Sequence, residues 1–156
     1  MYILDAPRLR DDLVHNRVPA SDLAIYAFLV AGVSLPIWVP GHAEHSLPSG
    51  VFALGVFLGH LVVAAYGTRA CYIANGGPTG HDFLNRFIPL GWVVGVRFAL
   101  LLAIPVTLLP FVISKVSSTA IADGALEIAV LGAEAVYFRR LSLQISLVRD
   151  AAGPTA

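Results

Sequence analysis

The ionisable side chains that stand inside otherwise apolar stretches are the residues best suited to chemistry in this sequence. Arg97 lies in GWVVGVRFALL, and Glu127 and Glu134 lie seven residues apart in the last apolar stretch. A charge in hydrocarbon costs about 2.5–3.5 kcal/mol on insertion scales, so such a group is normally paired or faces water. Together they could bind a cation or pass a proton. The candidate intramembrane polar cluster consists of Arg97, Glu134, Glu127, His60 and Asp123.

Depth within the apolar stretches predicts a partner for Arg97. Measured from the boundary that is expected to be cytoplasmic, the helical rise places the backbone of Arg97 ~15 Å deep, that of Glu134 ~6 Å and that of Glu127 ~17 Å. Side chains lean toward the N-terminus of a helix, which brings Arg97 and Glu134 toward one level. We therefore predict an Arg97–Glu134 pair. Boundary errors of about ±2–4 residues keep Glu127 as the alternative partner. In a purely structural interpretation the pair only holds helices together, and His60 is an ordinary core histidine.

The elements that must position these groups are four apolar stretches long enough to cross a membrane. A spanning helix needs about 20 mostly apolar residues. The chain is 57% hydrophobic and only 13% charged, against about 25% charged in soluble proteins. The expected fold class is all-α integral membrane, with four antiparallel transmembrane helices. The predicted parts are a leader at 1–20 with a short amphipathic interfacial helix, a membrane domain at 21–148 with spans at 22–40, 49–72, 87–114 and 119–148, and a disordered tail at 149–156.

Arginines indicate the orientation of these spans. They precede the first span, flank the loop after the second and follow the fourth, whereas the opposite side has only Lys115. Cytoplasmic loops carry the excess of positive charge. Both termini are therefore expected in the cytoplasm, in a plasma membrane such as the bacterial inner membrane. The arginines are Arg8, Arg10, Arg17, Arg69, Arg86, Arg139, Arg140 and Arg149.

Small residues recur at four-residue spacing in three of the spans. Such faces let membrane helices approach closely, within one chain or between chains. We expect tight packing, with the lipid bilayer and either self-association or other membrane subunits as partners. The helix-packing residues are Gly55, Gly59, Gly91, Gly95, Ala125, Ala129 and Ala133.

The loop between the second and third spans holds the densest turn chemistry in the chain. Asn75, Gly76 and Gly77 predict a helix stop and a tight turn, and HDFLNRF predicts an interfacial helix. The loop could be a docking surface or gate that exposes His81, Asp82 and Arg86, or a plain connector. It lacks the GxxxxGK[ST] pattern of a phosphate loop.

Several functions are disfavoured by composition. Cys71 is the single cysteine, so no intrachain disulfide or Cys-x-x-Cys pair can form. His42, Glu44 and His45 are a weak metal signal, and we expect no metal or cofactor. Ten basic and ten acidic residues without a basic tract give no indication of nucleic acid.

These observations predict a non-catalytic membrane protein that acts as an assembling or accessory subunit, not an enzyme. The alternative is a homo-oligomeric ion channel or proton-coupled transporter, whose path would be lined by the polar cluster.

Overall fold

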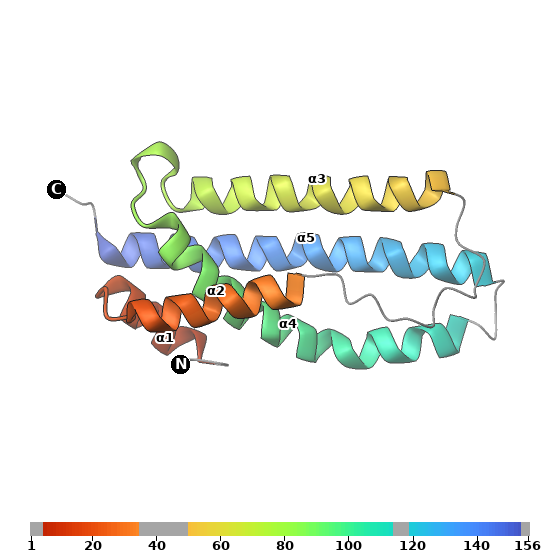
Figure 1. The fold of residues 1–156 in the computed structure, drawn as a ribbon, viewed down its shortest axis with the longest axis horizontal. Coiled ribbons are helices and arrows are strands. Elements are labelled where there is room, and N and C mark those ends of the chain that lie inside the picture. Colours follow the sequence, from red (N-terminus) through yellow and green to blue (C-terminus); the bar gives the residue numbers. More distant parts are fainter. Residues whose placement is uncertain (1–4, 35–49, 114–118, 154–156) are drawn as a thin grey trace.

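The chain is all-helical throughout the residues that its computed structural model describes, which are 5–34, 50–113 and 119–153. Side chains are described for 5–30, 54–101 and 124–153. Asp123, His42, Glu44, His45 and Lys115 therefore lie outside the described side chains. Within the described ranges there are five α-helices and one 3-10 turn: α1 (Ala6–Val14), α2 (Ala20–Ser34), α3 (Gly50–Ala74), η1 (Gly77–Thr79), α4 (Phe83–Ile113) and α5 (Thr119–Ala152) (Figure 1).

The all-helical class predicted from the sequence is confirmed, and two helix bounds differ from expectation. α4 begins at Phe83, so most of the HDFLNRF segment, which was expected as an interfacial helix leading into the third span, forms the first turn of that long helix. α5 continues through Ala152, into the part of 149–156 that was expected to be disordered. Val148 is fully buried and Arg149 complements the helix dipole. Gly153, at φ +75°, then ends the helix in the left-handed conformation.

α5 is the central helix of the molecule. It packs against α3 on one side and against α4 on another, while α2 packs against α4. α3 and α5 run in the same direction and α2 and α4 run in the opposite one (Figure 1). Helices that follow one another in the chain are thus antiparallel, as predicted, but the most extensive contact joins the parallel helices α3 and α5. Their shared direction decides which polar residues lie at equal depth.

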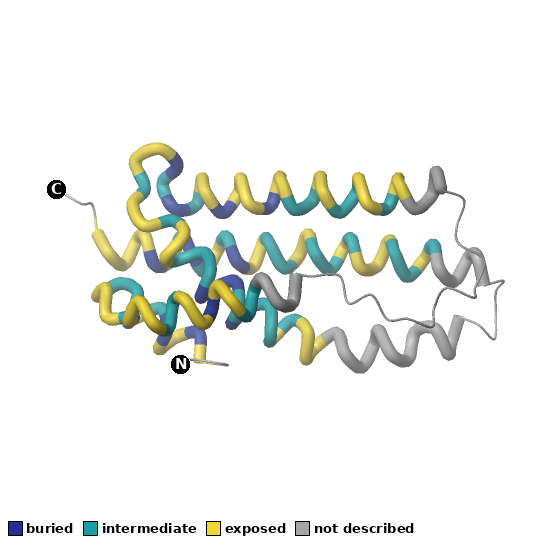
Figure 2. Tube along the Cα trace, viewed as in Figure 1, coloured by how far each residue is buried: buried dark blue, intermediate teal, exposed yellow. Residues whose placement is uncertain are grey.

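Among the residues whose burial is described, the most buried lie at the end that holds α1 and the C-terminal part of α5 (Figure 2). α1 begins with Asp5, whose carboxylate accepts a hydrogen bond from the Arg8 N–H at 3.1 Å. Its apolar side enters the core through the fully buried Leu9. The amphipathic helix predicted before the first span is therefore present, and its apolar side packs against α4 and α5. The core cluster comprises Ala6, Leu9, Cys71, Leu90, Val93, Val94, Leu141, Ile145 and Val148.

Two helices have the length and composition to cross a membrane among the described residues. They are Leu54–Ala74 in α3 and Phe83–Leu101 in α4, and Ala20–Val30 in α2 is a shorter apolar helix. The described part of α5 does not qualify, because it carries Glu127, Glu134 and three arginines. α3 turns a row of large apolar side chains outward, namely Leu54, Phe57, Leu58, Leu61, Val62 and Tyr66.

Candidate polar site between two parallel helices

His60 of α3 lies between the two glutamates of α5. Its Nδ1 atom is 2.8 Å from Glu134 Oε2, within hydrogen-bond distance, and its Nε2 atom is 3.7 Å from Glu127 Oε2. The two glutamates are seven residues apart, about 10.5 Å along the helix axis, which leaves room for an imidazole between them. Each ring nitrogen therefore faces a different carboxylate. A neutral imidazole can donate to only one carboxylate, whereas an imidazolium can donate to both.

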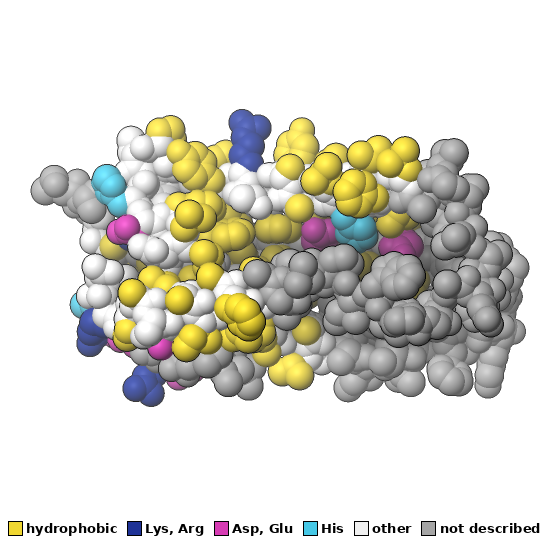
Figure 3. Space-filling view, viewed as in Figure 1, with side chains coloured by type: hydrophobic (Ala, Val, Ile, Leu, Met, Phe, Trp, Pro, Cys, Tyr) yellow, Lys and Arg dark blue, Asp and Glu magenta, His cyan; other side chains and the backbone are white. Residues whose placement is uncertain are grey.

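This site is only partly covered by the chain itself. The side chains of His60, Glu127 and Glu134 are 33%, 39% and 24% exposed. Figure 3 shows a histidine with an acidic side chain on either side of it, part-way along the molecule and next to the hydrophobic side chains of α3. Inside a bilayer, such groups have to face protein or a water-filled cavity. The site is consequently incomplete in a single chain surrounded by lipid.

The structure gives Glu134 a partner that depth matching applied to Arg97 did not identify. Arg97 is an exposed residue of α4, and its pairing with Glu134 stays a prediction. The same depth estimate, counted from the starts of the two parallel helices, places His60 between Glu127 and Glu134 but nearer to Glu127, so it predicts the group of three and not the shorter contact with Glu134. His60 is ten residues from the start of α3, while Glu127 and Glu134 are eight and fifteen residues from the start of α5. What the sequence lacked was the information that α3 and α5 are parallel neighbours.

Three of the predicted packing glycines lie against α5 within the chain. A Cβ atom added at Gly59 would lie 3.3 Å from the Leu131 side chain, and one at Gly91 would lie 3.2 Å from the Tyr137 hydroxyl. That hydroxyl also donates a hydrogen bond to the Gly91 carbonyl, at 3.2 Å. Gly95 faces the Tyr137 ring. These glycines hence allow α3 and α4 to pack on α5.

α3 also packs closely against α5 at Gly67, a glycine outside the predicted four-residue pattern. A Cβ atom added at Gly67 would overlap the Phe138 ring. Gly67 has no small residue four positions away on the inner side of α3, so the four-residue pattern could not reveal it. Other small residues remain open: an added Cβ atom at Gly55 or Gly132 would meet nothing within 4 Å, and Ala125 and Ala129 are exposed.

The loop between α3 and α4 has a defined structure built around Asn75, which is buried, with 1% of its surface exposed. Its amide nitrogen donates to the His81 carbonyl at 3.0 Å, and its amide oxygen accepts from Arg86 Nη1 at 3.0 Å. The turn needs Gly76 at φ +107° and Gly77 at φ +57°, in the left-handed region that favours glycine. The predicted helix stop and tight turn are confirmed, and Asn75 is the residue that joins the turn to α4.

The side chains of His60, Glu127 and Glu134 do not converge on one point. No set of three potential metal ligands occurs among the described residues. The arrangement instead resembles a proton-sharing or charge-compensating row across a helix interface. Comparisons with protein-family models, with curated proteins and with solved structures gave no match for this chain.

Proposed function

We propose that this chain is an integral membrane protein that works as a non-catalytic, assembling subunit. In this proposal α2, α3, α4 and α5 cross the bilayer, and α1 and the 75–86 loop lie at its cytoplasmic face. The two membrane-length helices and the outward apolar row on α3 support a bilayer as the solvent of the middle of the molecule. Arginines at the end with α1 support its cytoplasmic orientation.

The observation that carries the assembly proposal is the partial exposure of the His60 site. Polar groups at membrane depth that face lipid are costly, so a second chain or enclosed water has to cover them. A single copy leaves a quarter to two fifths of these side chains open. Assembly supplies the missing cover.

A second uncovered feature supports self-association. At 100° per residue, Ala125, Ala129 and Gly132 lie on the side of α5 opposite Glu127 and Glu134. This small-residue stripe would let another helix approach closely. The His60 site and the small-residue stripe are different surfaces on opposite sides of α5. Contact between one surface of one copy and the other surface of the next is a head-to-tail interface, which forms a closed ring if successive rotations add up to a full turn.

The stoichiometry of the protein in native-lipid nanodiscs tests the proposal. We expect more than one chain per particle, and we expect Ala129→Leu to reduce the assembled fraction because leucine holds the helices apart. Ala65→Leu makes the same change at an exposed position of α3 and should leave assembly intact. One chain per particle, with no other subunit bound, would contradict the proposal.

A proton-coupled channel or transporter is the second candidate function, because each nitrogen of His60 faces a different carboxylate. An imidazole in this position can accept a proton on one side and release it on the other. Proteoliposomes with an imposed pH gradient test this candidate. Wild type should dissipate the gradient and His60→Gln should not, whereas His81→Gln in the loop should behave like wild type. If wild-type protein shows no flux, the channel or transporter candidate is contradicted and only the subunit function stands.

A further inference from the structure

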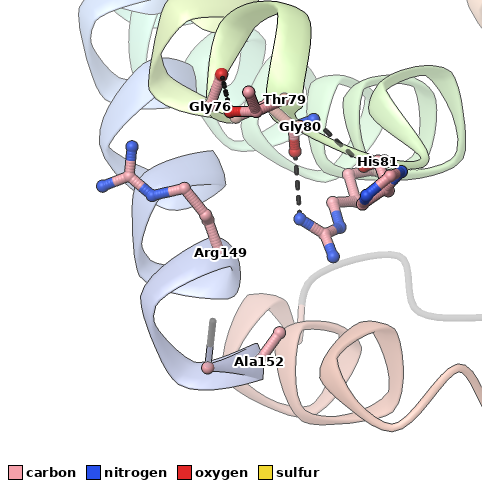
Figure 4. Close-up of a pocket in the computed structure, with 9 residues that line it drawn as sticks. Gly76, Thr79, Gly80, His81, Arg149 and Ala152 are labelled. Carbon is pink, nitrogen blue, oxygen red and sulfur yellow. Dashed lines mark hydrogen bonds between the residues drawn. The ribbon is translucent and has the colours of Figure 1, made fainter. Parts of the chain in front are cut away.

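A cavity of about 190 Å³ lies between the α3–α4 turn and the C-terminal end of α5. Figure 4 shows the turn on one side of it and Arg149 and Ala152 on the other. The cavity is basic: two arginines and a histidine line it, and none of its lining residues is acidic. They are Asn75, Gly76, Thr79, Gly80, His81, Arg86, Arg149, Ala152 and Gly153.

Arg86 is held in place by the loop. The buried Asn75 side chain accepts from one guanidinium nitrogen of Arg86, Nη1, and is itself fixed by the His81 carbonyl. Gly80 allows this arrangement, since a Cβ atom there would collide with the Asn75 backbone and lie 2.8 Å from its amide nitrogen. A guanidinium has five N–H donors in a planar fork. The contact of Nη1 with Asn75 fixes the plane of the Arg86 guanidinium, keeps its positive charge and leaves its other N–H groups able to donate to a ligand.

Arg149 supplies the second cation from α5. Its side chain lines the cavity, and its guanidinium donates to the Asp150 carboxylate at 2.7 and 2.8 Å. This pair is exposed, and exposed ion pairs contribute little to stability. Rotation of Arg149 into the cavity therefore costs little if an anion is there to meet it.

We propose that this cavity binds a phosphate group. Arginine forks match the oxygens of a phosphate with two parallel hydrogen bonds, and a tetrahedral phosphate can meet forks from two directions, as Arg86 and Arg149 would approach it. The cavity lies at the same end of the molecule as α1, where the proposed topology puts the cytoplasmic headgroup layer. The phosphate could belong to a lipid headgroup or to a soluble compound, and the chemistry of recognition is the same.

Binding to full-length protein in a neutral detergent distinguishes the two sources. The probes are short-chain phosphatidic acid, short-chain phosphatidylcholine with the same acyl chains, and inorganic phosphate, each followed by thermal shift and native mass spectrometry. Phosphatidic acid should bind and phosphatidylcholine should bind at least about tenfold more weakly, since its headgroup carries a compensating cation. Binding of inorganic phosphate as well would indicate a soluble ligand. Failure of both phosphatidic acid and phosphate to bind overturns the proposal.

Variants assign the binding to the cavity. Arg149→Gln should weaken binding about tenfold, in proportion to the loss of one charge-assisted hydrogen-bonding partner, and it leaves the turn intact. Arg139→Gln makes the same change on α5 outside the cavity and should bind like wild type. Arg86→Gln should weaken binding further. Because Arg86 also holds Asn75, the stability of this variant without ligand is measured as well, to separate loss of binding from loss of the loop structure. Equal weakening in Arg139→Gln and Arg149→Gln would show nonspecific charge attraction and contradict the site.

Discussion

At the scale of single residues, the imidazole of His60 and the carboxylate of Glu134 form a hydrogen-bonded contact between α3 and α5. His60 Nδ1 and Glu134 Oε2 are 2.8 Å apart, whereas His60 Nε2 and Glu127 Oε2, at 3.7 Å, are beyond ordinary hydrogen-bond distance. The two glutamates therefore differ in role although they share a face of α5. Glu134 orients the ring, and Glu127 supplies charge at its other side.

Glu134→Gln should consequently lower the thermal stability more than Glu127→Gln. Loss of the Glu134 charge weakens its hydrogen bond with His60, which contributes about 1–2 kcal/mol to stability. Because the site is partly exposed, we expect the lower value. A thermal-unfolding midpoint in detergent, measured for both variants, checks the order. Equal effects would mean that the 2.8 Å contact is not maintained in the membrane-extracted protein.

A double-mutant cycle tests the pairing that sequence depth predicted for Arg97. If Glu134 is coupled to His60, the stability changes of His60→Gln and Glu134→Gln should fall short of additivity by about 0.5–1 kcal/mol. The same cycle with Arg97→Gln and Glu134→Gln measures the predicted pair. Coupling in both cycles means that Glu134 interacts with both His60 and Arg97, and additivity in the second assigns Arg97 to another partner.

Gly80 gives a residue-scale test of the loop. Gly80→Ala should destabilise the turn, because the added methyl group collides with the backbone of Asn75. The fully buried Asn75 would then lose its fixed position, and Arg86 its anchor. Gly132→Ala is the matched control, since nothing lies within 4 Å of an added Cβ atom there. Hydrogen exchange of the 75–86 segment should rise in the first variant and not in the second.

At the scale of elements, Gly67 and Phe138 determine how closely α3 and α5 pack. Gly67→Ala should destabilise the protein by about 1–3 kcal/mol, as overpacking does, because the ring must move. Gly55→Ala on the same helix meets nothing and should be neutral or slightly stabilising, since alanine is the better helix former. Gly67→Ala should cost less in a Phe138→Ala background than in wild type, because the ring that the new methyl group meets is then absent. Thermal midpoints of wild type, the three single variants and the double variant provide the comparison.

The helices themselves could be predicted from the sequence, because apolar length and turn residues are local signals. The 75–77 stop and the amphipathic α1 were visible in the same way. Helix neighbours could not be predicted, since they depend on which faces fit sterically. The contact of His60 with Glu134 and the fit of Phe138 over Gly67 both require α3 and α5 to be parallel neighbours. A single glycine without a repeat gives no pattern from which such a contact could be inferred.

At the scale of the whole molecule, the basic cavity and the outward apolar row of α3 lie at different places along the described helices. α1, the α3–α4 turn and the last turns of α5 meet at one end (Figure 1), where the buried core and the basic cavity lie. Away from this end, the sides of α3 and α5 carry exposed apolar groups and the His60 site. A membrane around the apolar part would place the arginine-bearing end at one interface.

Site-directed labelling tests this orientation in intact cells. In a Cys71→Ser background, a single cysteine in place of His81 should be protected from an impermeant thiol reagent until the cells are permeabilised. One in place of Lys115 should react from outside, because the predicted topology puts positions 81 and 115 on opposite faces of the membrane. The positive-inside rule sets the direction of the expectation. External reaction at 81 with protection at 115 would invert the orientation. Equal reactivity at both sites would mean that α4, which connects them, does not cross the membrane.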